Sequence, residues 1–219
     1  MKKFILTLSL FTIFLNYSCT QENPPEMSSD ANIKLNDIQL PKGFKIDVFA
    51  TGIEDARSLA IGKNGIVFVG NRSHDKVYAV VDTDGDFKAE EKHIIVENLN
   101  MPNGVALQNN NLYVAEVSRI LRFESIYKNY KDKPEYNVIY NDFPTDRHHG
   151  WKYIDFGPSG KLYVPVGAPC NICESEDSIY ASITRMDPDG KNMEIFSEGV
   201  RNTVGFAWHP KTKELWFTD

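Results

Sequence analysis

The segment that decides the fold is Ile154-Asp155-Phe156-Gly157-Pro158-Ser159-Gly160-Lys161-Leu162-Tyr163-Val164. A triplet of mostly apolar residues is followed by a Gly-Pro-Ser-Gly turn, and the turn by a strand that carries an aromatic residue. The same order of triplet, polar turn and aromatic strand occurs in three further segments, at 59–69, 105–114 and 206–217. The aromatic residues that align are Phe68, Tyr113, Tyr163 and Trp216.

These repeats of roughly 50 residues, built from strands and turns, predict an all-β fold, a β-propeller with one blade per repeat. The propeller is expected over residues 40–219, with about four blades present. Four blades do not close a typical propeller, so we expect an N-terminal fragment of a longer chain, with C-terminal blades missing. The alternative is an independent four-bladed or two-sheet domain.

Composition limits the partners. The chain of 219 residues is 42% hydrophobic and 25% charged, which is ordinary for a soluble globular protein. Its net charge of −6 argues against nucleic acid, which requires a basic face. Small molecules and proteins remain open as partners.

The N-terminus resembles a bacterial lipoprotein signal. Residues 1–18 combine two lysines with an apolar stretch too short to span a bilayer. Cys19 would then be the lipidated first residue, and residues 19–39 a flexible tether. We expect a protein of the bacterial cell envelope that faces the periplasm or exterior and contacts the membrane only through its lipid anchor. The alternative is an ordinary secretory signal with an incidental cysteine.

Three polar positions lie just upstream of repeat triplets and should converge at the central channel. His149 is the candidate general base, because an imidazole titrates near neutral pH. Its neighbour His148 should point to the other side if the segment is extended. Arg201 and Asn202 offer a planar cation and an amide, and Asn103 offers a second amide. The simpler alternatives are a loop-capping histidine, a surface ion pair for Arg201 and a plain turn at Asn103.

The pair Cys170 and Cys173 predicts a short-loop disulfide, with a free dithiol as the alternative. No second cysteine or histidine pair is spaced to complete a zinc site, and Glu174 replaces the histidine that haem attachment needs. The acidic segment 82–86 is interpreted as a hairpin turn, with a surface calcium ion as a minor alternative. No metal ligand is therefore predicted in the chain.

Two motifs carry a family resemblance. His149-Gly-Trp-Lys-Tyr-Ile-Asp-Phe-Gly-Pro-Ser-Gly-Lys-Leu-Tyr-Val and Gly-Val-Arg201-Asn202-Thr-Val-Gly-Phe-Ala-Trp resemble the soluble glucose/sorbosone dehydrogenase family, whose cofactor is pyrroloquinoline quinone (PQQ). Ala168-Pro-Cys-Asn also resembles the sorbosone-dehydrogenase-like branch. The resemblance implies a propeller that is six-bladed when complete, with PQQ over its channel and calcium bound by ligands expected beyond Asp219.

The resemblance also implies roles for individual residues. His149 would take the proton from the C1 hydroxyl of an aldose or aldosone while the hydride passes to PQQ, and an external acceptor would then receive the electrons. Arg201, Asn202 and Asn103 would lie at the cofactor. One alternative is a metal-dependent lactonase of the gluconolactonase type, with Asn103 as a metal ligand. The other is a non-catalytic propeller lipoprotein.

Overall fold

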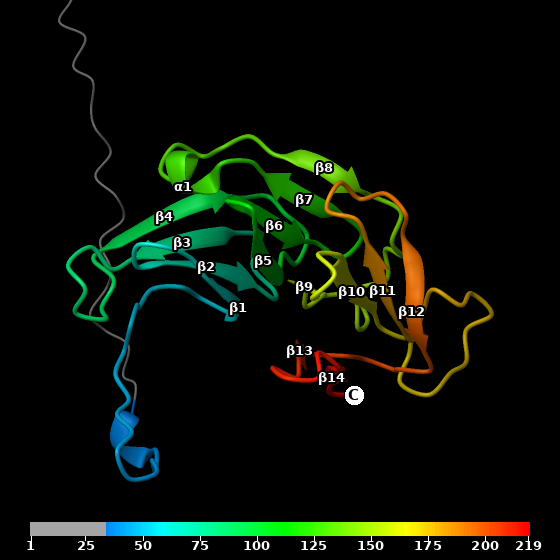
Figure 1. Ribbon diagram of the computed structural model, residues 1–219, viewed down its shortest axis with the longest axis horizontal. Helices are drawn as coiled ribbons and strands as arrows, with labels where there is room; N and C mark the ends of the chain where they lie inside the picture. The colour runs from blue at the N-terminus through cyan, green and yellow to red at the C-terminus, as the bar shows by residue number, and fades with distance from the viewer. Residues whose placement is uncertain (1–33) are drawn as a thin grey trace, which may run out of the picture.

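The computed structural model describes residues 34–219 and places them in four antiparallel sheets that fan around one concave side (Figure 1). Three sheets have four strands and one has two. In each sheet, the strand that comes first along the chain lies nearest the concave side (Figure 1). These strands are β1, β5, β9 and β13. This architecture confirms an all-β propeller with about four blades.

The strands follow one another along the chain, and each pairs with its sequence neighbour. The first blade holds β1 (Ala56–Ile61), β2 (Ile66–Asn71), β3 (Val77–Val81) and β4 (Glu91–Val96). The second holds β5 (Gly104–Gln108), β6 (Asn111–Ala115), β7 (Ile120–Phe123) and β8 (Asn137–Tyr140). The third holds β9 (Asp155–Phe156), β10 (Leu162–Val166), β11 (Ser182–Met186) and β12 (Glu194–Glu198). The last sheet holds β13 (Phe206–Trp208) and β14 (Leu215–Phe217), and the short helices are η1 (Leu35–Asp37) and α1 (Ile126–Asn129).

Local sequence explains the repeating turn between the first two strands of a blade. In the third blade, Gly160 has φ +81°, a conformation that favours glycine, and its N–H donates to the Gly157 carbonyl at 2.8 Å. The turn therefore leads Phe156 directly into pairing with Leu162.

The aligned aromatics join one blade to the next. Tyr113 of β6 packs edge-on against Phe156 of β9, with ring centroids 4.7 Å apart. Tyr163 of β10 packs in the same way against Trp208 of β13, at 5.2 Å. Phe68 of β2 is fully buried in a cluster with residues of the second blade. The repeat recognised in the sequence is thus the packing unit of the propeller, because each second strand supplies the apolar contact for its neighbour.

Strand direction brings two sets of loops to the same end of the blades. Each first strand begins at this end and each second strand finishes there. The segments before β5, β9 and β13 therefore lie together with those after β2, β6, β10 and β14. His149, Asn103 and Arg201 all occur in this first set.

The predicted signal peptide and the predicted lipidation site Cys19 lie outside the described residues. Of the predicted tether, residues 34–39 are described and include η1. Within residues 34–219, no helix has both the length and the apolar character needed to cross a membrane.

Candidate active site

His149 lies in the loop that enters β9, in a tight turn. The Gly150 N–H donates to the Arg147 carbonyl at 3.1 Å, and His149 itself has φ +51°. A side chain at position 150 would collide with the Asp146 carbonyl oxygen, so glycine is required there. The turn directs the half-buried His149 ring towards the end of β10.

The hydrogen bond of the His149 ring fixes its tautomer. The Nδ1 atom lies 2.9 Å from the carbonyl oxygen of Ala168, just after β10. A carbonyl oxygen can only accept, so Nδ1 carries the proton in this contact. The neutral ring then has its lone pair on Nε2, which is the form that a general base requires.

The expected separation of His148 from His149 is wrong. Their ring centroids are 4.1 Å apart with an interplanar angle of 53°, so the two rings lie side by side. The alternation that we assumed holds for extended backbone, whereas His149 is in the left-handed region. His148 Nε2 also lies 3.2 Å from Asn171 Oδ1 in the cysteine loop.

Arg201 and Asn202 are joined to His149 through the end of β10. The Ala168 N–H donates to the Arg201 carbonyl at 2.8 Å, so Ala168 contacts both predicted site residues. A Cβ atom on Gly167 would lie 2.5 Å from the His149 Cβ and 3.2 Å from Asn202 Oδ1. Glycine at 167 therefore allows His149 and Asn202 to approach the same backbone.

An open pocket of about 840 Å³ adjoins Arg201 and is lined largely by the segment from Ala168 to Ala181. Cys170 and Cys173 form a disulfide within this segment. The Tyr180 hydroxyl donates to Asp146 Oδ2 at 2.5 Å, and this hydrogen bond raises the Tyr180 pKa to about 12. The disulfide loop thus forms a wall of the pocket beside the predicted site.

Asn103 does not share the contacts that join His149 to Arg201. Its side chain is fully buried, and its Nδ2 donates to the Lys152 carbonyl at 2.8 Å. Its Oδ1 is buried without a hydrogen-bond partner. Asn103 also lies against Gly70, where a Cβ would collide with its carbonyl oxygen. The described contacts of Asn103 thus connect blades, and they do not include His149 or Arg201.

Lys152 is a feature that the sequence analysis missed. Its side chain is 1% exposed, and its Nζ donates to the Gly150 carbonyl at 3.2 Å and lies 5.2 Å from the centroid of the Phe143 ring. Burial lowers the pKa of the amine to about 7. The only sequence signal was a lysine in an otherwise apolar segment after His149.

A second feature that was not predicted is the pair of arginines that pack against Trp151. The guanidinium carbon of Arg57 lies 4.8 Å from the ring centroid, and that of Arg72 lies at 5.6 Å. Arg57 belongs to β1 and Arg72 follows β2, so the first blade covers a residue that enters the third. Contacts of this kind carry no local sequence signal.

The acidic hairpin behaves as a turn. Asp82, Asp84, Asp86 and Glu90 bring their carboxylates within 4.8 Å of one another. All four carboxylates accept hydrogen bonds inside the hairpin; for example, Asp82 accepts from the Gly85 N–H at 2.6 Å and Glu90 from the Thr83 N–H at 2.7 Å. The hairpin joins β3 to β4 at the end of the blade away from His149, so it is separate from the predicted site.

The fold and the site together define a β-propeller with a histidine, an arginine and an amide at one end of its blades. The chain belongs to the family described as a domain of unknown function, DUF7133, whose model matches residues 31–218. It is 29% identical over 193 residues to an uncharacterized protein of Borreliella burgdorferi, covering 83% of this chain and 49% of that protein. The chain therefore spans about half the length of this relative.

Solved structures with the same fold include sugar-oxidising enzymes. The PQQ-bound form of aldose sugar dehydrogenase from Streptomyces coelicolor aligns with a TM-score of 0.62 and 23% identity, covering 78% of this chain and 58% of that one. A structure described as a candidate gluconolactonase aligns with a TM-score of 0.58 and 16% identity, covering 89% of this chain and 64% of that one. At these identities the likeness establishes the fold.

Proposed function

We propose that the protein is a quinoprotein sugar dehydrogenase that oxidises an aldose or aldosone at C1. The observation that carries the proposal is the hydrogen bond from His149 Nδ1 to the Ala168 carbonyl, because it leaves the Nε2 lone pair free for a substrate proton. The resemblance of both motifs to the PQQ-dependent family and the fold shared with an aldose sugar dehydrogenase support it.

The residues at the end of β10 fit a flat, anionic quinone. Gly167 lets His149 and Asn202 pack against the same point of the backbone, so an imidazole and an amide lie together there. The exposed Arg201 guanidinium forms no ion pair with the described carboxylates and is free to bind a quinone oxygen or carboxylate. Arg201 and Asn202 would therefore hold PQQ, and bound PQQ would supply the acceptor for the C1 hydride.

The chain's own groups would handle the proton. His149 Nε2 accepts the proton of the C1 hydroxyl as the C1–H bond breaks, and the sugar leaves as a lactone two electrons more oxidised. The positive charge that develops on the imidazole is stabilised by the Ala168 carbonyl at Nδ1. The external electron acceptor, the calcium ion, the sorbosone-like preference and attachment to the cell envelope through Cys19 are further parts of the proposal.

Reconstitution of the full chain with PQQ and calcium, followed by aldose-dependent dye reduction, tests the proposal. His149→Gln should lower kcat at least about 100-fold, in the range of general-base contributions. His74→Gln is the matched control, because the His74 side chain is 49% exposed and its ion pair is with Glu54, at 3.5 Å. Dye reduction that survives His149→Gln would overturn the assignment of the base.

The second candidate is a metal-dependent lactonase. It is favoured by one observation, the buried Asn103 Oδ1 that lacks a partner. Among residues 34–219, however, the histidine, cysteine and carboxylate side chains that could share a metal ion gather at the β3–β4 hairpin and not around Asn103. Lactone hydrolysis that depends on a divalent ion, without dye reduction, would favour this candidate.

A further inference from the structure

The arginines of this chain fall into two groups. Arg119, Arg122 and Arg185 each pair with a glutamate. The other group forms no ion pair with a carboxylate of the described residues, and it consists of Arg57, Arg72, Arg147 and Arg201. All members of this second group are exposed and lie near the end of the blades that holds His149. A chain of net charge −6 thus presents four guanidinium groups without an ion-pair partner at this end.

Two members of this group are held over one aromatic ring. Arg57 and Arg72 approach the Trp151 centroid to 4.8 Å and 5.6 Å, while Trp151 itself is only 8% exposed. Cation–π contact fixes a guanidinium through its flat face and leaves its N–H donors free at the edge. The result is a pair of oriented cations with unused donors, which suits a planar or tetrahedral oxyanion.

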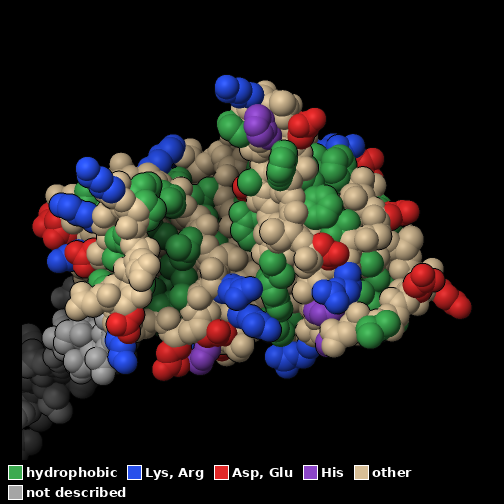
Figure 2. All heavy atoms as spheres, turned by 90° about the horizontal axis from the view of Figure 1, so that it is seen from below, with side chains coloured by type: hydrophobic (Ala, Val, Ile, Leu, Met, Phe, Trp, Pro, Cys, Tyr) green, Lys and Arg blue, Asp and Glu red, His purple; other side chains and the backbone are tan. Residues whose placement is uncertain are grey.

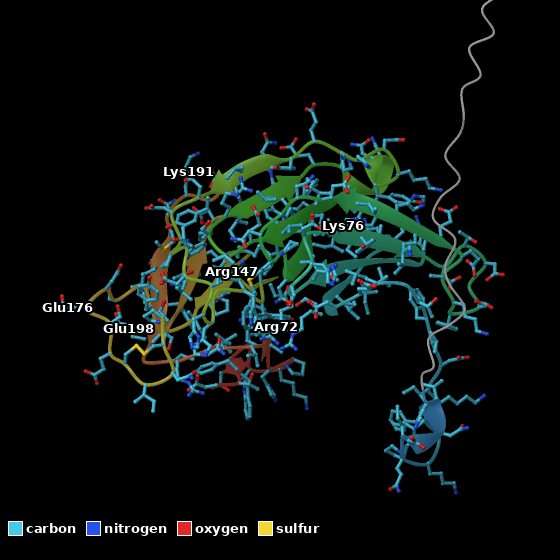
Figure 3. The ribbon with its side chains drawn as sticks, turned by 180° about the vertical axis from the view of Figure 1, so that it is seen from behind. Arg72, Lys76, Arg147, Glu176, Lys191 and Glu198 are labelled. Carbon is cyan, nitrogen blue, oxygen red and sulfur yellow. A yellow bond between two sulfur atoms is a disulfide. The ribbon has the colours of Figure 1, made fainter. Side chains whose placement is uncertain are left out.

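The pair lies close to the candidate base. Trp151 follows His149 by two residues, and Arg72 comes directly after β2 at the same end of the blades. Figure 3 shows Arg72 at the edge of the body that faces the concave side, and Figure 2 shows basic, acidic and histidine side chains together on the face seen from below. The ring that both guanidinium groups contact thus belongs to the same loop as the candidate base.

Asp55 is a negative charge close enough to interact with Arg72, but it forms no ion pair with either arginine. Burial would raise the Asp55 pKa, but hydrogen bonds from Ser73 and the charges of His74 and Arg72 outweigh it and lower the pKa. Asp55 is thus an anion whose carboxylate already accepts the Ser73 N–H. It forms no ion pair with Arg57 or Arg72, and both guanidinium groups keep donors for a ligand.

We infer that Arg57 and Arg72, held over Trp151, bind the anionic group of a sugar substrate, a carboxylate or a phosphate, whose C1 end is presented to His149. The inference rests on the proposed function and adds a substrate class to it. Neutral aldoses would lack this contact, so the subsite would favour acidic sugars.

The test measures binding of D-glucuronate, glucose 6-phosphate and D-glucose to the full chain without cofactor, by titration calorimetry at low salt. We expect at least one of the two anionic sugars to bind about tenfold more tightly than glucose, a difference of about 1.4 kcal/mol. The double variant R57Q/R72Q should bring this ratio to about 1, and added salt should reduce it in the wild type. R185Q is the matched control, because Arg185 also lies over a ring, that of Phe196 at 4.9 Å, but pairs with Glu194.

Comparing the two anionic sugars distinguishes a carboxylate from a phosphate as the group that is bound. Whichever anionic sugar binds more tightly identifies the carboxylate or the phosphate as the group bound. Equal binding of all three sugars, or a preference that survives R57Q/R72Q, would overturn the inference. A double variant that loses PQQ affinity but keeps the sugar preference would overturn it too, by assigning these arginines to the cofactor. Absence of dye reduction with an intact anion preference would instead refute the proposed dehydrogenase and leave the subsite standing.

Discussion

Replacing the buried Lys152 by methionine should change how stability depends on pH. Lys152 is 1% exposed, and the described polar contact of its amine is the Gly150 carbonyl. Burial lowers its pKa to about 7, whereas an unfolded lysine has a pKa of about 10.4. Between these values the unfolded chain binds a proton that the folded chain does not, so the free energy of unfolding rises with pH.

The size of the effect follows from the shift. One proton of difference corresponds to about 1.4 kcal/mol per pH unit, and the full shift to about 5 kcal/mol. The cost of burying the charge is fully present below about pH 7 and disappears above about pH 10. Methionine has similar length and no charge, so Lys152→Met should remove this dependence, apart from a constant loss for the unpaired Gly150 carbonyl.

Urea unfolding followed by circular dichroism between about pH 7 and pH 9.5 measures the difference. The wild type should gain about 3 kcal/mol relative to Lys152→Met over two pH units. Lys128→Met, which removes an exposed amine on α1, controls for the loss of one positive charge. A difference between wild type and Lys152→Met that stays constant with pH would refute the argument from burial.

The remaining predictions concern the site and the core. Gly167→Ala places a Cβ 2.5 Å from that of His149, so kcat should fall about 100-fold while the circular dichroism spectrum is retained; activity near wild type would show that the end of β10 does not position the base. Phe68→Ala empties a fully buried site between the first two blades and should cost about 3–5 kcal/mol in urea unfolding; a loss below about 1 kcal/mol would contradict its place in the core.

Much of the fold could be predicted because its signals are local. The aromatic strands and polar turns recur along the chain, and they place Phe68, Tyr113 and Tyr163 in the second strand of each blade. The approach of Arg201 to His149 followed from the shared loop position. These inferences needed only periodicity, turn chemistry and the rule that propeller loops meet at one end.

The rest of the site depends on contacts that have no sequence pattern. The left-handed backbone of His149 brings His148 beside it, and a positive φ is uncommon enough for any residue other than glycine that the sequence does not predict it. Asn103 turns towards the Lys152 carbonyl because the third blade supplies an acceptor from a distant segment. The guanidinium pair over Trp151 joins the first blade to the third in the same way.

Because neighbouring strands run in opposite directions, each blade has two ends, and these two ends should differ in how well they tolerate insertions. The end with His149 is tied by backbone contacts such as Ala168 to Arg201, so a length change there would move several groups together. At the opposite end, the β3–β4 hairpin closes on its own carboxylates and contacts no residue of the candidate site. Insertions, labels or surface attachment at that hairpin should therefore be tolerated. Attachment through the hairpin would immobilise the protein with its candidate active site facing solution.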